Sequence, residues 1–275
     1  MFERGDGDLM LPFMRAVERY GMIEPGDGVL LAVSGGKDSL AMLELFARCR
    51  AEGRLDMRLH ATMVLTDITC SGSVRPGDLA QLCRSSGIPF SMLYYPLSKE
   101  TNQQLSCYYC SMRRRTGLIK LAFAKGLNCI AMGHHMDDIV ETMVMNMVGH
   151  GNISTMPPRV DLFGGRLKLI RPLCYVREEG TGRYAGGIMR VPAHAPCPAL
   201  LGSNRKDTKR FLRELEEVVP GAVENLFGML EGVAERRGMV AGRFAAAGGG
   251  NGGELPGGEL PGGQLPGGQL LGGRG

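Results

Sequence analysis

Groups that can hold a polyphosphate follow one another directly in Ser34-Gly35-Gly36-Lys37-Asp38-Ser39. The two glycines lack Cβ atoms, so the backbone can turn sharply there and present successive N–H groups to an anion. The lysine adds a positive charge, and the two serines add hydroxyl donors. Asp38 is an anion beside this predicted phosphate site, which is favourable if a Mg²⁺ ion lies between the carboxylate and a phosphate. The sequence therefore predicts a phosphate site that differs from a Walker A loop, with an ordinary glycine turn as the alternative.

Cysteines with metal-ligand spacing form a second group. Cys107 and Cys110 are a C-x-x-C pair, and Cys197 follows later between two prolines. Three thiolates would hold three irons of a [4Fe–4S] cluster and leave one iron open for a ligand such as hydrosulfide. A zinc site and a redox-active C-x-x-C pair remain as alternatives, because the spacing alone does not separate these chemistries.

Acidic and imidazole groups crowd a third segment, Gly133-His134-His135-Met136-Asp137-Asp138. The segment follows an apolar run and opens a predicted helix, on which Asp137 and Glu141 would share one face. Asp137 is the first candidate for a catalytic group and Asp138 the second. Alternatively, the two aspartates satisfy the amides of the first helical turn, and His134 is a packed residue bonded to the backbone.

Basic residues follow both cysteine positions. Arg113, Arg114 and Arg115 come directly after the C-x-x-C pair, and Arg205 and Lys206 come after the later cysteine. This arrangement suits an RNA backbone brought to a reactive site where the target base is unstacked and held in a pocket. A solvated helix face is the alternative.

These residues lie where strands are predicted to end and helices to begin. Residues 29–33 indicate a buried parallel strand, and a helix over 40–50 follows it. The alternation continues, with strands predicted over 58–65, 90–95 and 128–132, and helices over 76–86, up to 124 and over 139–148. We therefore expect an α/β fold with a doubly wound, mostly parallel Rossmann-like sheet.

Composition divides the chain into four parts. Residues 1–24 contain a leading amphipathic helix, residues 25–150 form the predicted phosphate-binding domain, and residues 151–243 are a smaller C-terminal elaboration. Residues 244–275 consist of Gly- and Pro-rich repeats that cannot bury enough surface to offset their chain entropy, so disorder is expected. Within the elaboration, we expect strands over 167–173 and 187–191 and helices over 207–218 and 222–237.

Overall composition narrows the class of protein. The chain has 275 residues, 44% hydrophobic content and a net charge of +4, which is too mild to establish a nucleic-acid partner. No apolar run approaches the ~20 residues of a membrane span, and the N-terminus has no apolar signal region, so a cytoplasmic protein is expected. Its eight cysteines are then thiols or metal ligands. Core packing is the default for Cys49, Cys83, Cys129 and Cys174, whereas Cys70 could also carry a persulfide.

The chain resembles the PP-loop ATP pyrophosphatases, whose signature Ser-Gly-Gly-X-Asp-Ser is matched by Ser34 to Ser39. Within that superfamily it is similar to the tRNA 2-thiocytidine synthetases. The matching elements are Cys107 to Arg115, Gly133 to Thr142, and Pro196-Cys197 with Gly202-Ser203-Asn204. One departure is that family members commonly have another cysteine shortly after the third ligand, which residues 198–201 lack.

The resemblance implies an adenine nucleotide alpha-hydrolase-like fold and ATP, Mg²⁺ and a [4Fe–4S] cluster as cofactors. It further implies that cytosine O2 attacks the α-phosphate and that sulfur then displaces AMP. The expected partners are tRNA and a cysteine desulfurase or another sulfur donor. No membrane association is expected, and the protein could form a homodimer. The implied catalytic residues are Asp38, Asp137 and Asp138, and the implied nucleotide-binding residues are Ser34 to Ser39, Val64, Gly133 and His134. Sheet core is the alternative for Val64.

Two other functions remain open at this point. A tRNA lysidine synthetase shares the phosphate loop and the His-His-X-Asp-Asp element but does not need the three cysteines. A non-enzymatic sensor that binds a nucleotide, a metal and RNA is the second. The amount of bound metal would distinguish a lysidine synthetase from a thiolase. Release of pyrophosphate on addition of ATP and tRNA would exclude the non-enzymatic sensor.

Overall fold

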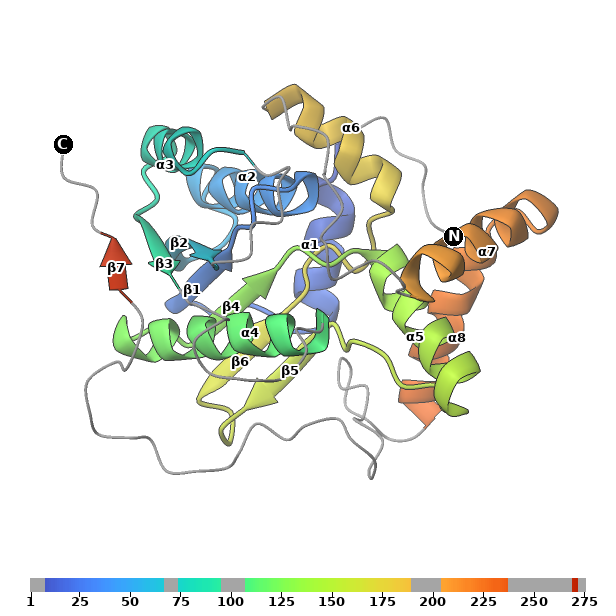
Figure 1. The fold of residues 1–275 in the computed structure, drawn as a ribbon. Coiled ribbons are helices and arrows are strands. Elements are labelled where there is room, and N and C mark those ends of the chain that lie inside the picture. The colour runs from blue at the N-terminus through green and yellow to red at the C-terminus, as the bar shows by residue number, and fades with distance from the viewer. Residues whose placement is uncertain (1–7, 67–73, 95–106, 189–203, 237–268, 272–275) are drawn as a thin grey trace.

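The computed structural model describes residues 8–66, 74–94, 107–188, 204–236 and 269–271, so Cys70 and Cys197 lie outside the described residues. Within this part of the chain, helices and strands alternate from β1 to α5 (Figure 1). The helices are α1 (Met10–Arg19), α2 (Lys37–Ala51), α3 (Pro76–Ser85), α4 (Cys107–Ala124), α5 (Met136–His150), α6 (Glu178–Ile188), α7 (Asn204–Val218) and α8 (Ala222–Arg236). The strands are β1 (Asp27–Ala32), β2 (Met57–Leu65), β3 (Phe90–Tyr94), β4 (Cys129–Met132), β5 (Arg159–Leu162), β6 (Leu167–Ile170) and β7 (Gln269–Leu271).

The described strands form one sheet in the order β5-β6-β4-β1-β2-β3-β7. Strands β3, β2, β1, β4 and β6 are parallel, and β5 and β7 pair antiparallel at the two edges. The chain winds outward from β1 in both directions, which confirms the doubly wound, mostly parallel sheet expected from the sequence. In such sheets a crevice opens at the carboxyl ends of the two strands where the order reverses, here β1 and β4.

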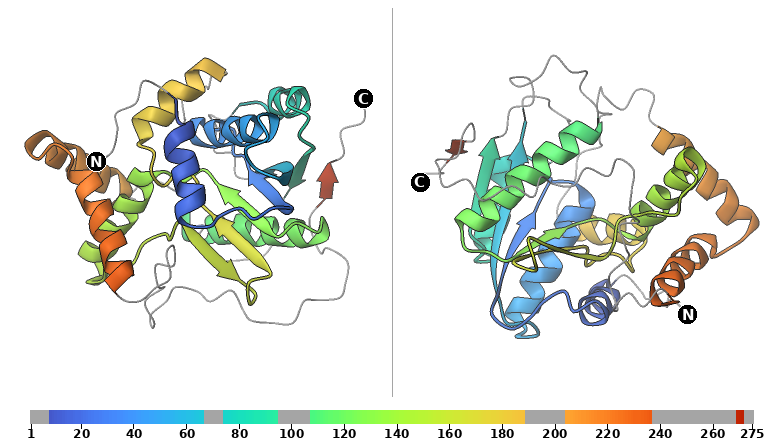
Figure 2. Two further views of the ribbon diagram at one scale, coloured as in Figure 1. Left: turned by 180° about the vertical axis from the view of Figure 1, so that it is seen from behind. Right: turned by 90° about the horizontal axis from the view of Figure 1, so that it is seen from below.

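Alternate side chains of β1 enter two hydrophobic clusters on opposite faces of the sheet. Leu30 packs with Leu118 and Ala122 of α4, whereas Val29 and Leu31 belong to a larger cluster that includes residues of α1, α2 and α5. Because successive strand side chains point to opposite faces, both faces are covered and the apolar run at β1 is buried. Helix α4 lies across its face of the sheet in Figures 1 and 2.

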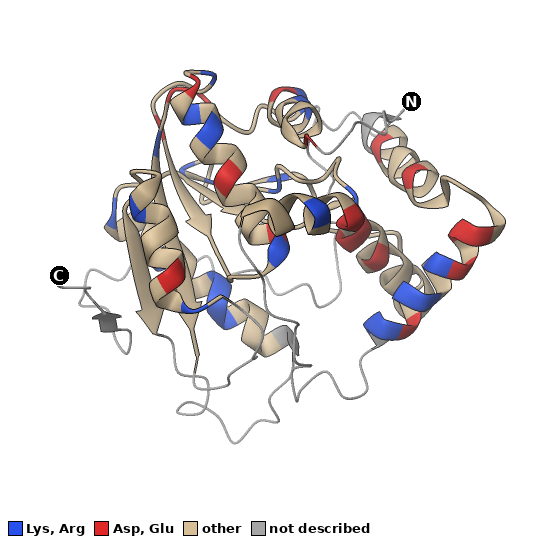
Figure 3. Cartoon of the chain, turned by 90° about the horizontal axis from the view of Figure 1, so that it is seen from above, with Lys and Arg blue, Asp and Glu red and all other residues tan. Residues whose placement is uncertain are grey.

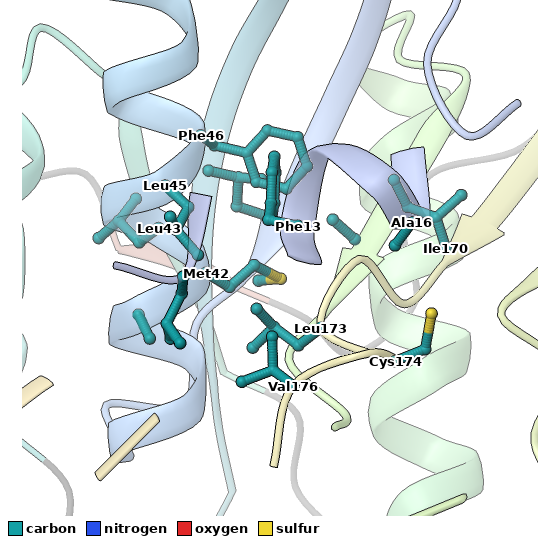
Figure 4. Packing of buried hydrophobic residues seen from close by; sticks show 14 of the residues in the cluster. Phe13, Ala16, Met42, Leu43, Leu45, Phe46, Ile170, Leu173, Cys174 and Val176 are labelled. Atoms are coloured by element: carbon teal, nitrogen blue, oxygen red, sulfur yellow. The ribbon is translucent and has the colours of Figure 1, made fainter. Parts of the chain in front are cut away.

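The larger cluster fixes the helix that follows the phosphate loop (Figure 4). Phe13 of α1 meets Phe46 of α2 edge to face, with ring centroids 5.1 Å apart, and both side chains are fully buried. Leu173 and Val176, from the segment after β6, pack in the same cluster. Each such side chain contributes roughly 1.5–3 kcal/mol by burial, so α2 and the loop at its start are held firmly.

Helices α7 and α8 extend the molecule beside α5, away from the sheet (Figure 2). Tyr20 and Tyr175 both donate hydrogen bonds of 2.5 Å to Glu231 of α8. The two tyrosine rings stack with centroids 5.8 Å apart, and Tyr175 also meets Phe227 edge to face. These contacts join α8 to the end of α1 and to the segment after β6, so the C-terminal helices are held in a fixed place beside α5.

The segment after β6 differs from its prediction. A strand was expected over 187–191, but the described residues continue helix α6 up to Ile188. Thr181 and Ala185 are buried at helical spacing, and the glycines around them hide this periodicity in the sequence. Gly180 allows close packing, since a Cβ there would lie 3.3 Å from the Leu9 side chain, whereas a Cβ on Gly182 would make an ordinary contact of 3.8 Å with Lys37.

Part of the repeat segment also differs from its prediction. Gln269–Leu271 form β7, in which Leu270 pairs with Leu93 of β3, so the expected disorder does not hold for these three residues. Earlier repeats read Leu-Pro, whereas this one reads Leu-Leu. A leucine offers the backbone N–H that proline lacks, which allows strand pairing here. No described helix combines the length and apolar character needed to cross a lipid bilayer.

Candidate nucleotide-binding and catalytic site

The predicted phosphate loop lies between β1 and α2, at the carboxyl edge of the parallel strands. Gly35 has a φ of 80°, a left-handed conformation that favours glycine. The Ser34 Oγ accepts from the Gly36 N–H at 3.3 Å and lies 3.2 Å from the Ser39 Oγ, which itself donates to the Gly36 carbonyl at 2.8 Å. The two serines thus brace the turn from inside, while the start of α2 adds its partial positive charge.

Lys37 and Asp38 form the charged part of this loop. The Lys37 Nζ lies 2.7 Å from Asp38 Oδ1 and 3.3 Å from Glu178 Oε1. Burial by itself lowers the pKa of Lys37, but the two carboxylates outweigh it, so the pKa is raised and the ammonium stays charged. Thr181 of α6 donates a short hydrogen bond to Asp38. Glu178 and Thr181 were not predicted as site residues, because they lie in α6, a helix that the local sequence does not indicate.

Gly133 brings the end of β4 against this loop. A Cβ at this position would lie 3.1 Å from the carbonyl carbon of Asp38 and from the backbone N and Cα of Ser39. Real Cβ atoms are seldom this close to backbone, so only glycine fits without displacing the start of α2. The predicted nucleotide-binding residue Gly133 therefore contacts the phosphate loop itself.

His135 begins α5 and closes a capping box. Its Nδ1 accepts from the Asp138 N–H at 3.3 Å, and the Asp138 carboxylate accepts from the His135 N–H at 3.2 Å. The His135 Nε2 lies 3.8 Å from Asp38 Oδ1. The loops after β1 and β4 therefore meet at the point where the strand order reverses, as the sheet topology requires.

Asp137 has both carboxylate oxygens engaged. Oδ1 accepts from the Arg177 Nε at 3.1 Å, and Oδ2 accepts from the Glu178 N–H at 2.8 Å. Asp137 thereby caps α6 and holds it over the phosphate loop, a contact that joins α5 to the segment after β6. Glu141 follows four residues later on the same helix, so the two residues share a face of α5 as expected, and the Glu141 carboxylate also shares a partner with Asp138.

Asp138 and Glu141 share one partner, Arg205 of α7. The Arg205 Nε donates to Glu141 at 3.0 Å, and its Nη2 makes a short contact with Asp138. Burial raises the pKa of Glu141 despite the opposing charge of Arg205. Burial alone would also raise the pKa of Asp138. The net effect is a lowered pKa, because the electrostatic interactions with His135, His134 and Arg205 outweigh burial. Arg205, predicted to bind RNA, is thus bound within the site.

His134 and Arg171 lie behind this acidic cluster. Burial and the charge of Arg171 lower the pKa of His134 to about 3, so the ring is neutral. Its Nδ1 is buried, and among the described residues it has no hydrogen-bond partner. Arg171 is itself buried, which lowers its pKa to about 9, and its Nη1 donates to the Pro157 carbonyl. The neutral His134 can offer a hydrogen bond but no charge.

Val64 lies near the end of β2 and packs, half-buried, against the hydrophobic cluster beneath α4. Ala32 and Met132 pack against the same cluster. This contact matches the sheet-core alternative for Val64. Its predicted role in nucleotide binding stays a proposal.

The predicted cluster cysteines are described only in part. Cys107 and Cys110 lie in the first turn of α4, three residues apart and so on one face of the helix. Cys110 is half-buried, and the Cys107 side chain and all of Cys197 lie outside the described residues. Among described residues there is no group of three His, Cys, Asp or Glu side chains placed to hold a metal ion. As predicted, four other cysteines are buried in the core: Cys49, Cys83, Cys129 and Cys174.

The predicted RNA-binding residues fall into two places. Arg113, Arg114 and Arg115 are half-buried on α4, with the Arg113 guanidinium 5.9 Å from the centre of the Tyr109 ring. Lys206 is exposed on α7. Both basic and acidic residues occur along α7 in Figure 3, so this helix does not present a uniformly positive face.

Comparison with known proteins identifies relatives over most of the chain. A family model described as a PP-loop domain matches residues 12–186. The tRNA-cytidine(32) 2-sulfurtransferase of Polynucleobacter asymbioticus is 38% identical over 223 residues, which cover 78% of this chain and 72% of that protein. The protein of the same name from Burkholderia vietnamiensis is 36% identical over 245 residues, which cover 85% and 70%.

Among solved structures, the U34-tRNA thiolase NcsA from Methanococcus maripaludis, with its [4Fe-4S] cluster, has a similar fold. The TM-score is 0.66, with 82% of this chain and 79% of that chain covered. Sequence identity is 21%, so this similarity concerns the fold alone.

Proposed function

Because the chain belongs to the PP-loop family of tRNA-cytidine(32) 2-sulfurtransferases, we propose that it converts cytidine 32 of tRNA to 2-thiocytidine in a reaction that consumes ATP. The observation that carries the proposal is the meeting of the phosphate loop with the α5 start, where His135 Nε2 lies 3.8 Å from Asp38. This is the crevice in which doubly wound sheets bind nucleotides.

ATP would bind with its phosphates over the loop that contains Ser34, Gly35, Gly36, Lys37 and Ser39. The backbone N–H groups and the Lys37 ammonium would stabilise the charge that develops on the departing pyrophosphate. The cytosine O2 would attack the α-phosphorus, forming one P–O bond as the bond to pyrophosphate breaks. A sulfide equivalent would then attack C2, and the C2–O bond would break with AMP as the leaving group.

The three proposed catalytic carboxylates differ in their freedom to act. Asp38 is the most exposed of them, and its oxygen fits Mg²⁺, which would offset the phosphate charge near Lys37. Asp137 and Asp138 are held by Arg177 and Arg205. We therefore propose that these two act through the position of α6 and α7 around the nucleotide, with Gly133 and His134 beside the phosphate loop.

The cysteine residues fit an iron–sulfur cluster by chemistry and spacing. Cys107 and Cys110 share one face of α4, whose N-terminus lies at the carboxyl edge of the sheet, since the helix runs antiparallel to the strand that follows. With Cys197 they would hold a [4Fe–4S] cluster, which when bound supplies an iron able to carry sulfur. Their place at the same edge as the phosphate loop supports this assignment.

The remaining partners follow from the same reaction. The tRNA backbone would be contacted by Arg113, Arg114, Arg115, Arg205 and Lys206. Arg205, whose side chain is 44% exposed, would also hold Asp138 and Glu141. A cysteine desulfurase or another protein would supply sulfur. We also propose that the protein is cytoplasmic. Its molar mass in solution would show whether it forms a homodimer.

Pyrophosphate release tests the ATP-dependent step. We expect the purified protein with ATP and tRNA to release pyrophosphate, and Lys37→Met to lower the rate at least about a hundredfold because a phosphate-binding charge is lost. Lys125→Met, an exposed change at the far end of α4, serves as the control. Release that is unaffected by Lys37→Met, or a product that carries lysine instead of sulfur, would contradict the proposal.

A further inference from the structure

Glu178 lies between two lysines from different helices. Its Oε1 is 3.3 Å from the Lys37 Nζ of α2, and its Oε2 makes a short ion pair with the Lys209 Nζ of α7. Two ammonium groups therefore approach one carboxylate directly beside the phosphate loop. The proposed function uses only the first of them.

The backbone around this carboxylate is fixed on both sides. The Glu178 N–H donates to Asp137, which also binds Arg177, so the start of α6 is held against α5. On α7, Arg205 is bound by two carboxylates one turn before Lys209, and residues four apart share a helix face. Lys209 is thus directed at the phosphate loop by the same contacts that fix α7.

The ion pairs themselves can exchange. Side-chain exposure is 33% for Lys37, 30% for Glu178 and 41% for Lys209, and pairs of this exposure contribute roughly 0–1 kcal/mol. Partial burial raises the pKa of Glu178, but Lys209 and Lys37 outweigh it and lower the pKa to about 2. The carboxylate is therefore ionised at neutral pH and competes with any other anion for both lysines.

We propose that Lys209 is a second phosphate-binding lysine and that Glu178 is its exchangeable counter-ion in the nucleotide-free protein. The phosphates of ATP displace the Glu178 side chain and then contact Lys37 and Lys209 together. A polyphosphate carries more charge than one carboxylate, and helix α6 keeps its place through Asp137 during the exchange. The inference rests on the proposed function in that the phosphate loop must bind ATP.

Lys209→Met tests the role of the lysine. The affinity of the full-length protein for α,β-methylene-ATP is measured with Mg²⁺ and without tRNA. We expect a Kd about tenfold higher than for the unchanged protein, which corresponds to about 1.4 kcal/mol. Arg213→Met is the matched control, because Arg213 is exposed on the next turn of α7 and, among the described residues, bonds to the Lys209 carbonyl of its own helix. We expect it to change the Kd less than twofold.

Glu178→Gln tests the competition. Removing the charge while keeping the shape should lower the Kd for the same analogue by about threefold to tenfold, and by less when Lys209→Met is also present. Weaker binding in Glu178→Gln, or equal binding in Lys209→Met and Arg213→Met, would overturn the inference while leaving the proposed function intact. Failure of the unchanged protein to bind the analogue would overturn both.

Discussion

At the scale of single residues, the site depends on backbone contacts as much as on charged groups. Gly133 allows β4 to end against Asp38 and Ser39, and Asp137 uses both oxygens to hold α6. Motif residues can therefore be necessary without touching a substrate. Their role is to place Lys37 and its neighbours at one edge of the sheet.

Gly133→Ala tests this positioning role. The added Cβ would meet backbone atoms at 3.1 Å, which cannot be relieved by a side-chain rotation. We expect the start of α2 to shift and the Kd for α,β-methylene-ATP to rise about tenfold, or about 1.4 kcal/mol. Gly149→Ala is the control, because nothing lies within 4 Å of a Cβ there. Unchanged affinity in a folded Gly133→Ala protein would contradict the role.

The sequence predicted the phosphate loop and the α5 start as chemical groups, because their residues are contiguous. It could not pair them with Glu178, Thr181 or Lys209, which lie in helices far along the chain. Arg205 shows the same limit: its place in a basic run predicted an RNA contact, but its ion pairs with Asp138 and Glu141 could not be predicted from the local sequence. Contacts set by long-range topology are not encoded in local spacing.

At the scale of elements, the amino edge of the sheet carries a buried polar network. Asp27 at the start of β1 accepts from Lys168 of β6 at 2.6 Å and from Asn128 at 2.7 Å. Asn128 in turn accepts from the Gly28 N–H at 2.8 Å. Asp27 and Lys168 are both buried, so this ion pair joins β1 to β6 across the strand between them.

This network predicts acid sensitivity. Burial raises the pKa of Asp27, but the hydrogen bonds from the Glu24 N–H, Lys168 and Asn128 outweigh it and lower the pKa. A carboxyl with a lowered pKa in the folded state stabilises the protein fully above its unfolded pKa of ~3.9. That contribution is lost as the pH falls through the folded value. Urea unfolding between pH 7 and pH 3 measures it.

Asp27→Asn should cost about 3 kcal/mol of unfolding free energy at pH 7, the lower end for a broken buried ion pair, because Lys168 loses its buried partner and keeps only the exposed Glu24 carboxylate at 3.3 Å among the described residues. The unfolding free energy of the variant should also fall less steeply below pH 4 than that of the unchanged protein. Adding Lys168→Met should restore part of the stability. Equal unfolding free energies for Asp27→Asn and the unchanged protein at pH 7 would contradict the network's role.

At the scale of the whole molecule, the amino and carboxyl edges of the sheet have different roles. The amino edge carries the buried ion pair that joins β1 to β6, and the carboxyl edge brings together the loops of the candidate site. The parallel sheet could be predicted because apolar strands and helices alternate regularly up to α5. Helix α6 could not, since glycines hide its period, and β5 and β7 are short edge strands without a strong pattern.

Deletion of residues 244–275 tests the contribution of the repeats. The described part of this segment is the short strand β7 at the outer edge of β3, far along the sheet from β1 and β4. We expect pyrophosphate release to stay within about twofold and the unfolding free energy to fall by less than about 1 kcal/mol. A deletion that abolishes activity in a folded protein would show a role for the repeats in the reaction.

The most direct test of ATP-dependent thiolation is mass spectrometry of tRNA nucleosides. The protein is prepared anaerobically with iron and sulfide and incubated with unmodified tRNA, sulfide and ATP. We predict 2-thiocytidine at position 32 in the complete reaction, and none when ATP is omitted or when Cys110→Ala replaces the unchanged protein. Cytidine that remains unmodified in the complete reaction, or thiolation that persists without ATP, would contradict the account.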